Sequence, residues 1–374
     1  MKVWVIGRGY PTAKSDMLGS FELEQAHMLS RAGLEVCYLA VDLRSIRRRR
    51  QFGFLSRQEA GVSIVTLNLP IGPLLSKEAR NKLYEWAMNR LTAYLNNRTG
   101  KPDVIHVHYP SLVPYSVVEK WQKQGTKIVA TEHWTSVQER CLPPVYLENL
   151  TNYVNRSDAM CCVGSNLKNA IIELTGTERP IYIVPNVVNE LFKPDTQSHE
   201  GFRFICSGRL VPVKQFDTIV ESFIDVFQNE KKVSLTVVGD GEEFKKIQAI
   251  VQKRNADDQV HLVGAVSRQK MADYMAECDA LVVFSRLETF CVPVIEAWAC
   301  GKPVIATDTT VLADNPDERL GVLADSQDPE TLKNALRKIY EKHAAYDPGW
   351  IRQYAVDHFS EKAVSRRLID IYKS

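Results

Sequence analysis

The hydrophobic positions follow two alternating patterns along the chain. Short runs rich in β-branched residues, such as residues 2–7 (KVWVIG), alternate with longer runs whose apolar residues recur at helical spacing, such as residues 77–96 and 216–227. The short runs are typical of buried strands and the longer ones of amphipathic helices. Strands that alternate with helices predict parallel sheets covered by helices on both faces. The expected strands are 2–7, 35–41, 62–69, 103–108, 127–133, 159–164, 181–185, 202–206, 234–239, 260–263, 280–285 and 303–307.

The alternation is interrupted at residues 193–201 (KPDTQSHEG), which are polar, contain Pro and Gly and lack periodicity. These features are typical of a linker. We therefore expect two doubly wound, Rossmann-like α/β domains, residues 1–194 and residues 195–347. Ligands of such sheets bind beyond the carboxyl ends of the strands, so a cleft between the two sheets is the expected place for a site.

Composition excludes several classes of protein. With 47 Lys and Arg against 45 Asp and Glu, the net charge of +2 argues against a dedicated nucleic-acid binder. No stretch approaches about 20 uninterrupted apolar residues, and the first apolar run is too short for a signal peptide. The eight cysteines show no C-x-x-C spacing, so we expect buried, reduced thiols in a cytoplasmic protein.

The segment 284–301 (FSRLETFCVPVIEAWACG) carries the first candidate chemistry. A predicted strand ends at Ser285, the following loop carries Glu288, and a helix is expected near Pro293 with Glu296 in its first turn. A helix N-terminus suits phosphate oxygens, and carboxylates accept hydrogen bonds from sugar and ribose hydroxyls. Alternatively, Glu296 merely offsets the helix dipole and Glu288 is a solvated loop residue. This segment alone favours neither interpretation.

The segment 206–214 (CSGRLVPVK) lies between a predicted strand and a predicted helix. Gly208 permits a tight turn there. Arg209 and Lys214 place two cations at the carboxyl end of the strand, where a guanidinium and an ammonium group can hold a diphosphate. A pair of surface cations is the ordinary alternative.

Taken in order, segments 206–214, 237–243 (VVGDGEE) and 261–307 resemble the nucleotide-sugar domain of GT-B glycosyltransferases, specifically the retaining family 4. That family pairs a G-R-L-x-x-x-K block with an E-x7-E motif, here Glu288 and Glu296. The resemblance extends over nearly the whole chain and implies the GT-B fold, with residues 348–374 packing back on the first domain. The segments of the first half that carry it are 102–108 (PDVIHVH), 129–136 (VATEHWTS), 163–171 (VGSNLKNAI) and 183–194 (IVPNVVNELFKP).

The resemblance also implies roles for individual residues. Arg209 and Lys214 would hold the donor diphosphate, Glu288 would face the transferred sugar, and Glu296 would bind the ribose hydroxyls. His133 would lie near the sugar and the acceptor. Backbone groups at further positions would contact or shape the donor site, and two side chains are acceptor-side candidates. The donor-site positions are Gly19, Gly208, Gly239, Gly241, Gly264, Phe290, Cys291 and Val292, and the acceptor-side candidates are His108 and Trp134.

Two positions depart from the family pattern. Many relatives have glycine where this chain has Cys291, and the first loop has Gly19 alone where paired glycines are usual. The pair Gly7 and Gly9 gives a weak dinucleotide-binding signal, because the third glycine of that fingerprint is replaced by Thr12. A plain turn at the end of the first strand is the favoured interpretation.

The implied activity is retaining transfer of a hexose-type sugar from a UDP- or GDP-sugar to a glycan or lipid-linked acceptor, in the synthesis of surface polysaccharide. No cofactor or metal is expected, because Arg209 and Lys214 would neutralise the diphosphate. His106 and His108 share one face of a strand but have no recognisable third zinc ligand. The alternatives are a GT-B-like nucleotide-sugar epimerase and a non-catalytic nucleotide-sugar-binding protein.

Residues 44–57 (RSIRRRRQFGFLSR) form a basic run between two predicted strands. A solvated loop is the usual outcome for such a run. The other interpretation is transient contact with an anionic membrane surface, with Phe52, Phe54 and Leu55 entering the interface. Because acceptors in the family are frequently lipid-linked, both stay open. The expected location is therefore cytoplasmic or peripheral on the inner face of the membrane.

Overall fold

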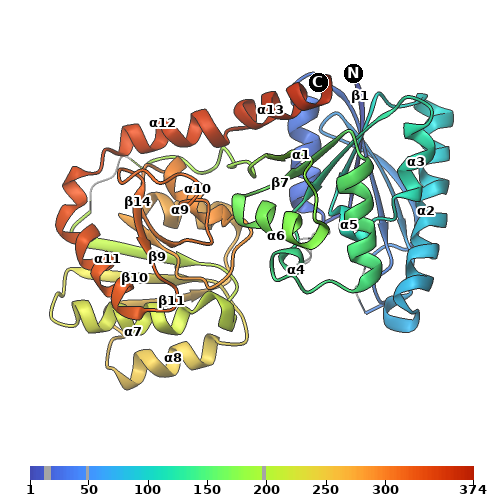
Figure 1. The fold of residues 1–374 in the computed structure, drawn as a ribbon. Coiled ribbons are helices and arrows are strands. Elements are labelled where there is room, and N and C mark those ends of the chain that lie inside the picture. Colours follow the sequence, from blue (N-terminus) through green and yellow to red (C-terminus); the bar gives the residue numbers. More distant parts are fainter. Residues whose placement is uncertain (12–17, 48–49, 196–198) are drawn as a thin grey trace. The chain divides into compact units, whose positions relative to one another are not determined.

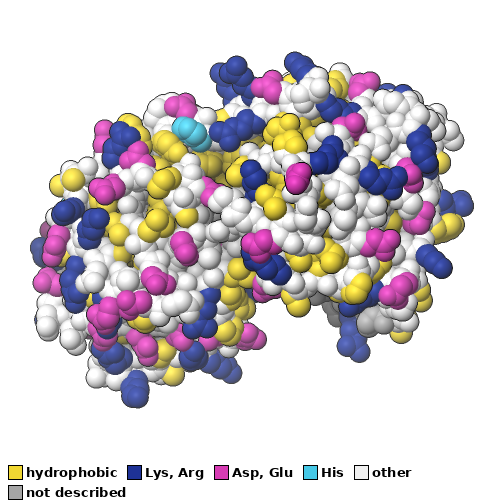
Figure 2. Space-filling model, viewed as in Figure 1, with side chains coloured by type: hydrophobic (Ala, Val, Ile, Leu, Met, Phe, Trp, Pro, Cys, Tyr) yellow, Lys and Arg dark blue, Asp and Glu magenta, His cyan; other side chains and the backbone are white. Residues whose placement is uncertain are grey.

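The chain forms two compact units in a computed structural model that describes residues 1–11, 18–47, 50–195 and 199–374. Unit 1 consists of Met1–Pro185 together with Val364–Ser374, and unit 2 is Asn186–Ala363 (Figure 1). Each unit is built around its own sheet, as the alternating pattern predicts. On the face shown in Figure 2, acidic and basic side chains are interspersed on both units, in keeping with the small net charge.

Unit 1 has an eight-stranded sheet in the order β3-β4-β2-β1-β5-β6-β7-β8. Its central strands β1, β2 and β5 are almost entirely buried, which explains why their sequences are continuous apolar runs. All neighbouring strands are parallel except β3 and β4. The strands are β1 (Lys2–Gly7), β2 (Glu35–Asp42), β3 (Gly53–Glu59), β4 (Val62–Asn68), β5 (Val104–His108), β6 (Lys127–Glu132), β7 (Ala159–Cys162) and β8 (Ile181–Ile183).

The longest helix of unit 1, α2, is capped at its N-terminus and buries one apolar face. The Ser76 side chain caps it by accepting a hydrogen bond from the Ala79 amide, and Ala87, Leu91 and Leu95 are buried on one face. The other helices connect the strands or cover the sheet. The helices are α1 (Ser20–Arg31), α2 (Lys77–Thr99), α3 (Ser116–Gln122), α4 (Thr135–Gln138), α5 (Pro144–Arg156), α6 (Ser165–Thr175) and α13 (Glu361–Lys373), with 3-10 turns η1 (Gly72–Leu74) and η2 (Pro110–Leu112).

The end of the basic run, residues 53–57, belongs to a strand, β3, whereas both interpretations of the run place it between two strands. Strand β3 pairs with β4 in an antiparallel hairpin, and its side chains alternate between exposed and partly exposed. The two-residue turn is formed by Ala60 and Gly61, whose φ values of 45° and 82° match the twist of a tight hairpin. The arginines and polar residues of the run hid this edge strand, whose pairing is set by β4.

Unit 2 has a six-stranded parallel sheet in the order β11-β10-β9-β12-β13-β14. Helix α7 contributes Phe223 and Phe227 to a cluster of buried residues that also includes Phe204 of the sheet. The strands are β9 (Phe202–Ser207), β10 (Val233–Val238), β11 (Val260–Gly264), β12 (Ala280–Val282), β13 (Val304–Thr307) and β14 (Gly321–Ala324). The helices are α7 (Phe216–Phe227), α8 (Phe244–Lys253), α9 (Arg268–Glu277), α10 (Val292–Ala299), α11 (Pro329–Lys342) and α12 (Pro348–Phe359), with 3-10 turns η3 (Pro212–Lys214) and η4 (His343–Ala345).

The units divide at Pro185 and Asn186, nine residues before the boundary predicted from the linker. Residues after the division are held within unit 2, because the Val188 amide donates to the Phe359 carbonyl (2.9 Å). Of the last helices, α12 stays in unit 2, where the Trp298 and Phe359 rings pack 5.8 Å apart and Arg352 donates to the Ala299 carbonyl (2.6 Å). The return to unit 1 thus begins at Val364 and not at residue 348.

The cysteines are free thiols, and all but one are buried as predicted. Cys141 is the exception and is exposed.

Candidate functional site

The strand order of unit 2 reverses between β9 and β12. From β9 the sheet grows through β10 to β11, and from β12 it grows through β13 to β14 in the opposite direction. Such a switch point opens a crevice at the carboxyl ends of the two central strands, where ligands of doubly wound sheets bind. The loop after β9 carries Arg209 and Lys214, and the loop after β12 carries Glu288. The two sequence motifs therefore meet at this crevice.

Lys214 and Glu288 form an ion pair across these two loops. Their side chains are 27% and 11% exposed, so both charges lie partly screened from water. Beside this pair, the Arg286 amide donates to the Val213 carbonyl (2.9 Å) and joins the two loops through their backbones. Two loops that are joined by a backbone hydrogen bond therefore hold one cation and one carboxylate at the switch point.

Gln215 is a supporting residue that the sequence analysis did not identify. It is buried, adopts a positive φ of 52°, and its amide donates to the carbonyls of Phe284 (2.8 Å) and Ser326 (2.9 Å). It therefore fixes the backbone directly after Lys214 to the loop that follows β12. The signal for Gln215 in the sequence was a polar residue directly before the apolar helix α7.

Arg209 is exposed, and no ion pair of its guanidinium is found among the described residues. The next residue, Leu210, is buried, and its amide donates to the Asp240 carbonyl (3.0 Å). The loop after β9 is thus bound to the loop after β10, which leaves Arg209 at the surface of the crevice.

The glycines of these loops are explained by contacts within the chain. A Cβ on Gly239 would lie 1.9 Å from the Gly208 carbonyl oxygen, and one on Gly241 would lie 2.3 Å from that of Leu210. Gly264 accepts a hydrogen bond from the Gly239 amide (2.9 Å) but has open space around its Cα. Gly239 and Gly241 are therefore required by close backbone approach, whether or not a ligand binds.

Cys291 is at the N-cap position of α10 with a φ of 73°, in the left-handed region. This region favours glycine, which gives a physical reason for the glycine that many relatives carry here. Cys291 is buried, and burial together with the nearby Glu288 carboxylate raises the pKa of its thiol. The thiol is therefore neutral, and the local turn is kept without glycine.

Helix α10 begins at Val292, directly after Cys291, with Pro293 at its second position. Glu296 is therefore its fifth residue, and our prediction that it lies in the first turn is wrong by one position. Its side chain is largely buried, with 9% of the residue exposed. Phe290 is also buried, and its carbonyl accepts from the Val311 amide (2.8 Å). The start of α10 thus lies beside Glu288, and Glu296 lies about one turn into the helix.

In unit 1, three histidines gather at the carboxyl ends of β5 and β6. His106 and His108 lie on one face of β5, and His133 follows β6. Nδ1 of His108 and Nε2 of His133 are 2.9 Å apart, and their rings stack with centroids 5.2 Å apart. His106 is completely buried between Tyr372 of α13 and Thr131, with 2.7 Å from Nδ1 to the phenol and 2.7 Å from Nε2 to the hydroxyl.

Burial keeps these three rings neutral. It lowers the pKa of His106 and of His108 well below the usual value, and the pKa of His133 to about 3. The adjacent rings and the positive charge of Arg8 act in the same direction. At neutral pH the cluster therefore offers hydrogen-bond donors and acceptors and no positive charge.

Glu132 positions His133 and Trp134. Its carboxylate is completely buried and accepts hydrogen bonds from the amides of both residues, each at 2.9 Å. Burial raises the pKa of this carboxyl group. No role for Glu132 is predicted from the sequence, although an acidic residue at the end of an apolar strand is a visible signal. Trp134 in turn packs edge-on against Tyr146, with ring centroids 5.8 Å apart.

The first strand-to-helix loop is built around Arg8 and Gly19. Nε of Arg8 donates to the buried Glu22 carboxylate (2.9 Å), and the guanidinium lies 3.5 Å from the centroid of the Tyr109 ring. Gly19 precedes α1 with a φ of 83°, and a Cβ there would lie 2.0 Å from the Gly9 carbonyl oxygen. Gly19 is therefore required by the approach of two loop segments. Thr12 and Met17 lie outside the described residues.

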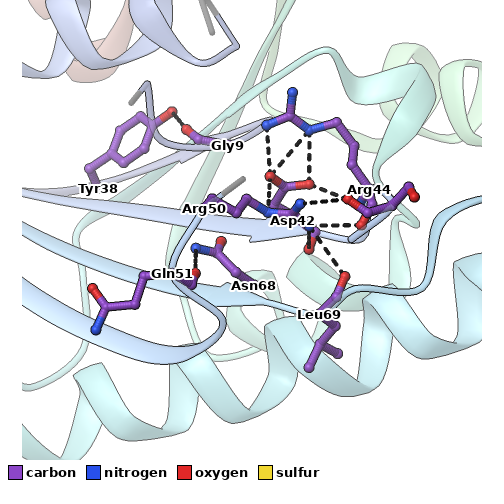
Figure 3. A network of polar contacts seen from close by, with 9 residues as sticks. Gly9, Tyr38, Asp42, Arg44, Arg50, Gln51, Asn68 and Leu69 are labelled. Atoms are coloured by element: carbon purple, nitrogen blue, oxygen red, sulfur yellow. Dashed lines mark hydrogen bonds and ion pairs between the residues drawn. The ribbon is translucent and has the colours of Figure 1, made fainter. Parts of the chain in front are cut away.

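The basic run contributes to the interior of unit 1 as well as to its surface. Asp42, at the end of β2, accepts hydrogen bonds from Nε (3.0 Å) and Nη2 (2.8 Å) of Arg44 and pairs with Arg50 (2.8 Å) (Figure 3). Arg50 has only 3% of its side chain exposed and also donates to the Arg44 carbonyl (2.9 Å). Arg47 is exposed, whereas Arg48 and Arg49 lie outside the described residues. Two of the run's cations are therefore committed to Asp42.

The sequence matches two family models that together cover most of the chain. Residues 21–190 match Glycosyltransferase Family 4, and residues 188–348 match Glycosyl transferases group 1. The chain therefore belongs to the glycosyltransferases that these two models describe. The meeting of the basic block with the E-x7-E loop at the switch point of unit 2 is consistent with that membership.

Two relatives illustrate the similarity in sequence. An uncharacterized glycosyltransferase of Methanocaldococcus jannaschii is 33% identical over 184 residues, which is 49% of this chain and 50% of that protein. N-acetyl-alpha-D-glucosaminyl L-malate synthase of Bacillus anthracis is 30% identical over 220 residues, 55% of this chain and 56% of that enzyme. The matched stretch thus spans about half of the length of each relative.

Solved structures establish the fold. Sucrose-phosphate synthase from Thermosynechococcus elongatus superposes with a TM-score of 0.78 at 22% identity, covering 100% of this chain and 98% of that one. Anabaena HepE in complex with UDP and glucose gives a TM-score of 0.72 at 16% identity, covering 100% and 99%. These similarities, over the whole chain, confirm the predicted GT-B fold. Among the described residues, no helix has the length and hydropathy that crossing a membrane requires.

Proposed function

We propose that this chain transfers a hexose-type sugar from a UDP- or GDP-sugar to a hydroxyl group of an acceptor, with retention at the anomeric carbon. The observation that carries the proposal is the ion pair of Lys214 and Glu288 at the switch point of unit 2, with Arg209 exposed in the same loop as Lys214. This combination offers cations for a diphosphate and a carboxylate for a sugar within one crevice.

In the proposed reaction, the bond between the anomeric carbon and the donor diphosphate breaks. A bond from the acceptor oxygen to that carbon forms on the same face. The acceptor proton passes to the leaving diphosphate oxygen. Lys214 and Arg209 would stabilise the charge that develops on the diphosphate, and Glu288 would hold the sugar in position. Glu296 would accept hydrogen bonds from the ribose hydroxyls.

On the acceptor side, neutral His133 would hydrogen-bond the transferred sugar or the acceptor. His108 and Trp134 would lie on the acceptor side. This assignment is supported by the position of the three residues at the carboxyl ends of β5 and β6. The acceptor would be a glycan or a lipid-linked molecule of surface-polysaccharide synthesis.

We further propose that the reaction needs no metal ion. Two fixed cations, Arg209 and Lys214, would supply the charge that a bound divalent ion supplies elsewhere.

Transient contact with an anionic membrane surface is also part of the proposal. It would be made by exposed Ile46, Phe52 and Phe54 together with Arg47, since Arg44 and Arg50 are held by Asp42. Co-sedimentation with vesicles containing phosphatidylserine tests this contact. Phe52→Ser combined with Phe54→Ser should weaken binding severalfold, and unchanged binding would rule the contact out.

A thermal-shift screen of the purified chain against UDP, GDP, ADP and NAD tests the donor assignment. A ligand at a hundred times its dissociation constant stabilises by about 2.7 kcal/mol. Stabilisation by UDP or GDP that is lost in Glu296→Ala supports the donor site. Stabilisation by NAD alone would reject it.

Product analysis separates transfer from the two alternative functions. An epimerase would convert the nucleotide-sugar without an acceptor, and a non-catalytic binding protein would bind UDP or GDP without turnover. Release of UDP or GDP that depends on an added acceptor supports transfer.

A further inference from the structure

A cavity of about 210 Å³ lies within unit 1 at the carboxyl ends of β1, β2 and β5. Much of its wall is apolar, with the side chains of Leu18, Leu43 and Val113 and the rings of Tyr84 and Tyr146. Its polar lining is dominated by arginines. This combination of apolar walls with a few convergent polar groups is typical of small-molecule sites.

The charged groups that line the cavity are mostly arginines. Among the described residues they are Arg8, Arg44, Arg80 and the carboxylate of Asp42. Arg8 is paired with Glu22, and Asp42 is shared between Arg44 and Arg50 (Figure 3). Arg8, Arg44 and Arg50 therefore each have a carboxylate partner within the chain.

Arg80, the fourth residue of α2, has no ion pair with a carboxylate among the described residues. It donates one hydrogen bond to the Gly72 carbonyl, and its Nε is buried without a hydrogen-bond partner among the described residues. A buried, unpartnered donor of a charged group is costly in free energy. A ligand oxygen that accepts from Nε would remove this cost, and an anionic oxygen would also pair with the positive charge of Arg80.

His108 supplies a second unpartnered polar atom in the same cavity wall. The residue is only 1% exposed, its Nδ1 is engaged with His133, and its Nε2 has no hydrogen-bond partner among the described residues. Because the ring is neutral, Nε2 either donates or accepts one hydrogen bond, and a ligand hydroxyl group can satisfy it in either case. The cavity thus combines an anion-binding group with a hydroxyl-binding group.

We infer that the acceptor is a small molecule that carries both a hydroxyl group and an anionic group, either a carboxylate or a phosphate. The anionic group binds Arg80, and the hydroxyl side of the molecule faces Nε2 of His108. This inference rests on the proposed function and replaces the glycan or lipid-linked acceptor named there with a small anionic one, because a neutral glycan would leave Arg80 without an anionic partner.

Calorimetric titration of the full-length chain with inorganic phosphate and with succinate tests the anion site. We expect saturable binding of at least one of them, weakened at least tenfold in Arg80→Gln and less than twofold in Lys82→Gln. Lys82 is an exposed cation on the same helix and provides the matched control. The more tightly bound anion identifies the anionic group of the acceptor.

Two further measurements keep the outcome unambiguous. The 15N–1H signal of Arg80 Nε, identified by its loss in Arg80→Lys, should shift with the anion in the wild-type chain, even if Arg80→Gln folds poorly. Anion binding that is lost in Lys214→Ala but kept in Arg80→Gln would place the anion in unit 2 and overturn the inference, as would no binding. A UDP titration of the same samples tests the donor site separately, so failure of the acceptor inference is distinguishable from failure of the proposed function.

Discussion

Lys214 and Glu288, separated by 74 positions in sequence, neutralise each other across the switch point of unit 2. A donor diphosphate at this point would compete with the Glu288 carboxylate for the Lys214 ammonium group. The two residues therefore act in opposite directions on nucleotide affinity, although both belong to the proposed catalytic machinery. Mutation of each residue in turn separates these effects.

Glu288→Gln should reduce turnover at least a hundredfold, because it removes the carboxylate proposed to hold the sugar in the transition state. It should leave UDP affinity unchanged or raise it severalfold, because Lys214 is released from its ion pair. Steady-state kinetics with calorimetric titration of UDP measures both effects. Glu242→Gln, an exposed neighbour in the same unit, is the control. A loss of UDP affinity as steep as the loss of turnover would contradict the role of Glu288.

Lys214→Ala should weaken UDP binding by about tenfold to a hundredfold, or about 1.4 to 2.7 kcal/mol. A charged hydrogen bond to the diphosphate is lost, and Glu288 then repels it. The dissociation constant for UDP, compared at low and high salt, measures the change. Lys245→Ala removes an exposed cation of α8 and should change affinity less than twofold. Equal affinity of Lys214→Ala and wild type would remove Lys214 from the donor site.

Prolonged treatment with EDTA should leave the transfer rate within twofold of its initial value. The reason is that Arg209 and Lys214 carry the charge needed at the leaving group. Rates are measured before chelation, after it and after addition of Mg²⁺ or Mn²⁺. A tenfold loss that either ion restores would show that the cations of the chain do not suffice.

Asp42→Asn should lower the free energy of unfolding by about 3–5 kcal/mol, because it removes the charge partner of buried Arg50 and of Arg44. Urea denaturation measures this loss. Glu139→Gln removes an exposed carboxylate from the same unit and should change stability by less than about 0.5 kcal/mol. If both variants are equally stable, the arginines around Asp42 are satisfied by other groups.

His106 should make the fold less stable as the pH falls below neutrality. Burial lowers its pKa in the folded chain, whereas the unfolded chain binds the proton with a pKa of about 6.5. Stability is therefore lost as the pH falls through about 6.5, by about 1.4 kcal/mol between pH 7.5 and 5.5 for one such histidine. Urea denaturation at the two pH values should show a loss smaller by that amount in His106→Gln. The control variant His343→Gln changes an exposed histidine and should behave as wild type. If His106→Gln loses as much stability between the two pH values as the wild type, His106 is protonated in the folded chain.

The elements whose signal is local were predictable from the sequence. Helix α7 and strand β1 have the predicted bounds. The apolar sequence of β1 predicts a buried strand, and the strand lies between β2 and β5 in the sheet. Strand β3 was missed because its alternating, arginine-containing sequence resembles a solvated segment, and only pairing with β4 makes it a strand. Likewise, α12 was assigned to unit 1 because its contact with Trp298 is invisible in the sequence.

The candidate site was predictable in its residue types but not in its pairings. Motif spacing named Lys214 and Glu288, yet their ion pair depends on the strand order that places β9 beside β12. The supporting role of Gln215 depends on the carbonyl groups of Phe284 and Ser326, which lie far along the chain and which no local pattern reveals.

The contact between His106 and Tyr372 has a consequence for co-translational folding. Unit 1 contains residues up to Pro185 and then Val364–Ser374, so all of unit 2 is synthesised before Tyr372 exists. Domains generally fold as they emerge, the N-terminal one first. Here the first sheet emerges early, while its buried histidine must wait for the partner phenol. Nascent unit 1 therefore remains incomplete for most of translation, and unit 2 is the first part of the molecule able to finish folding.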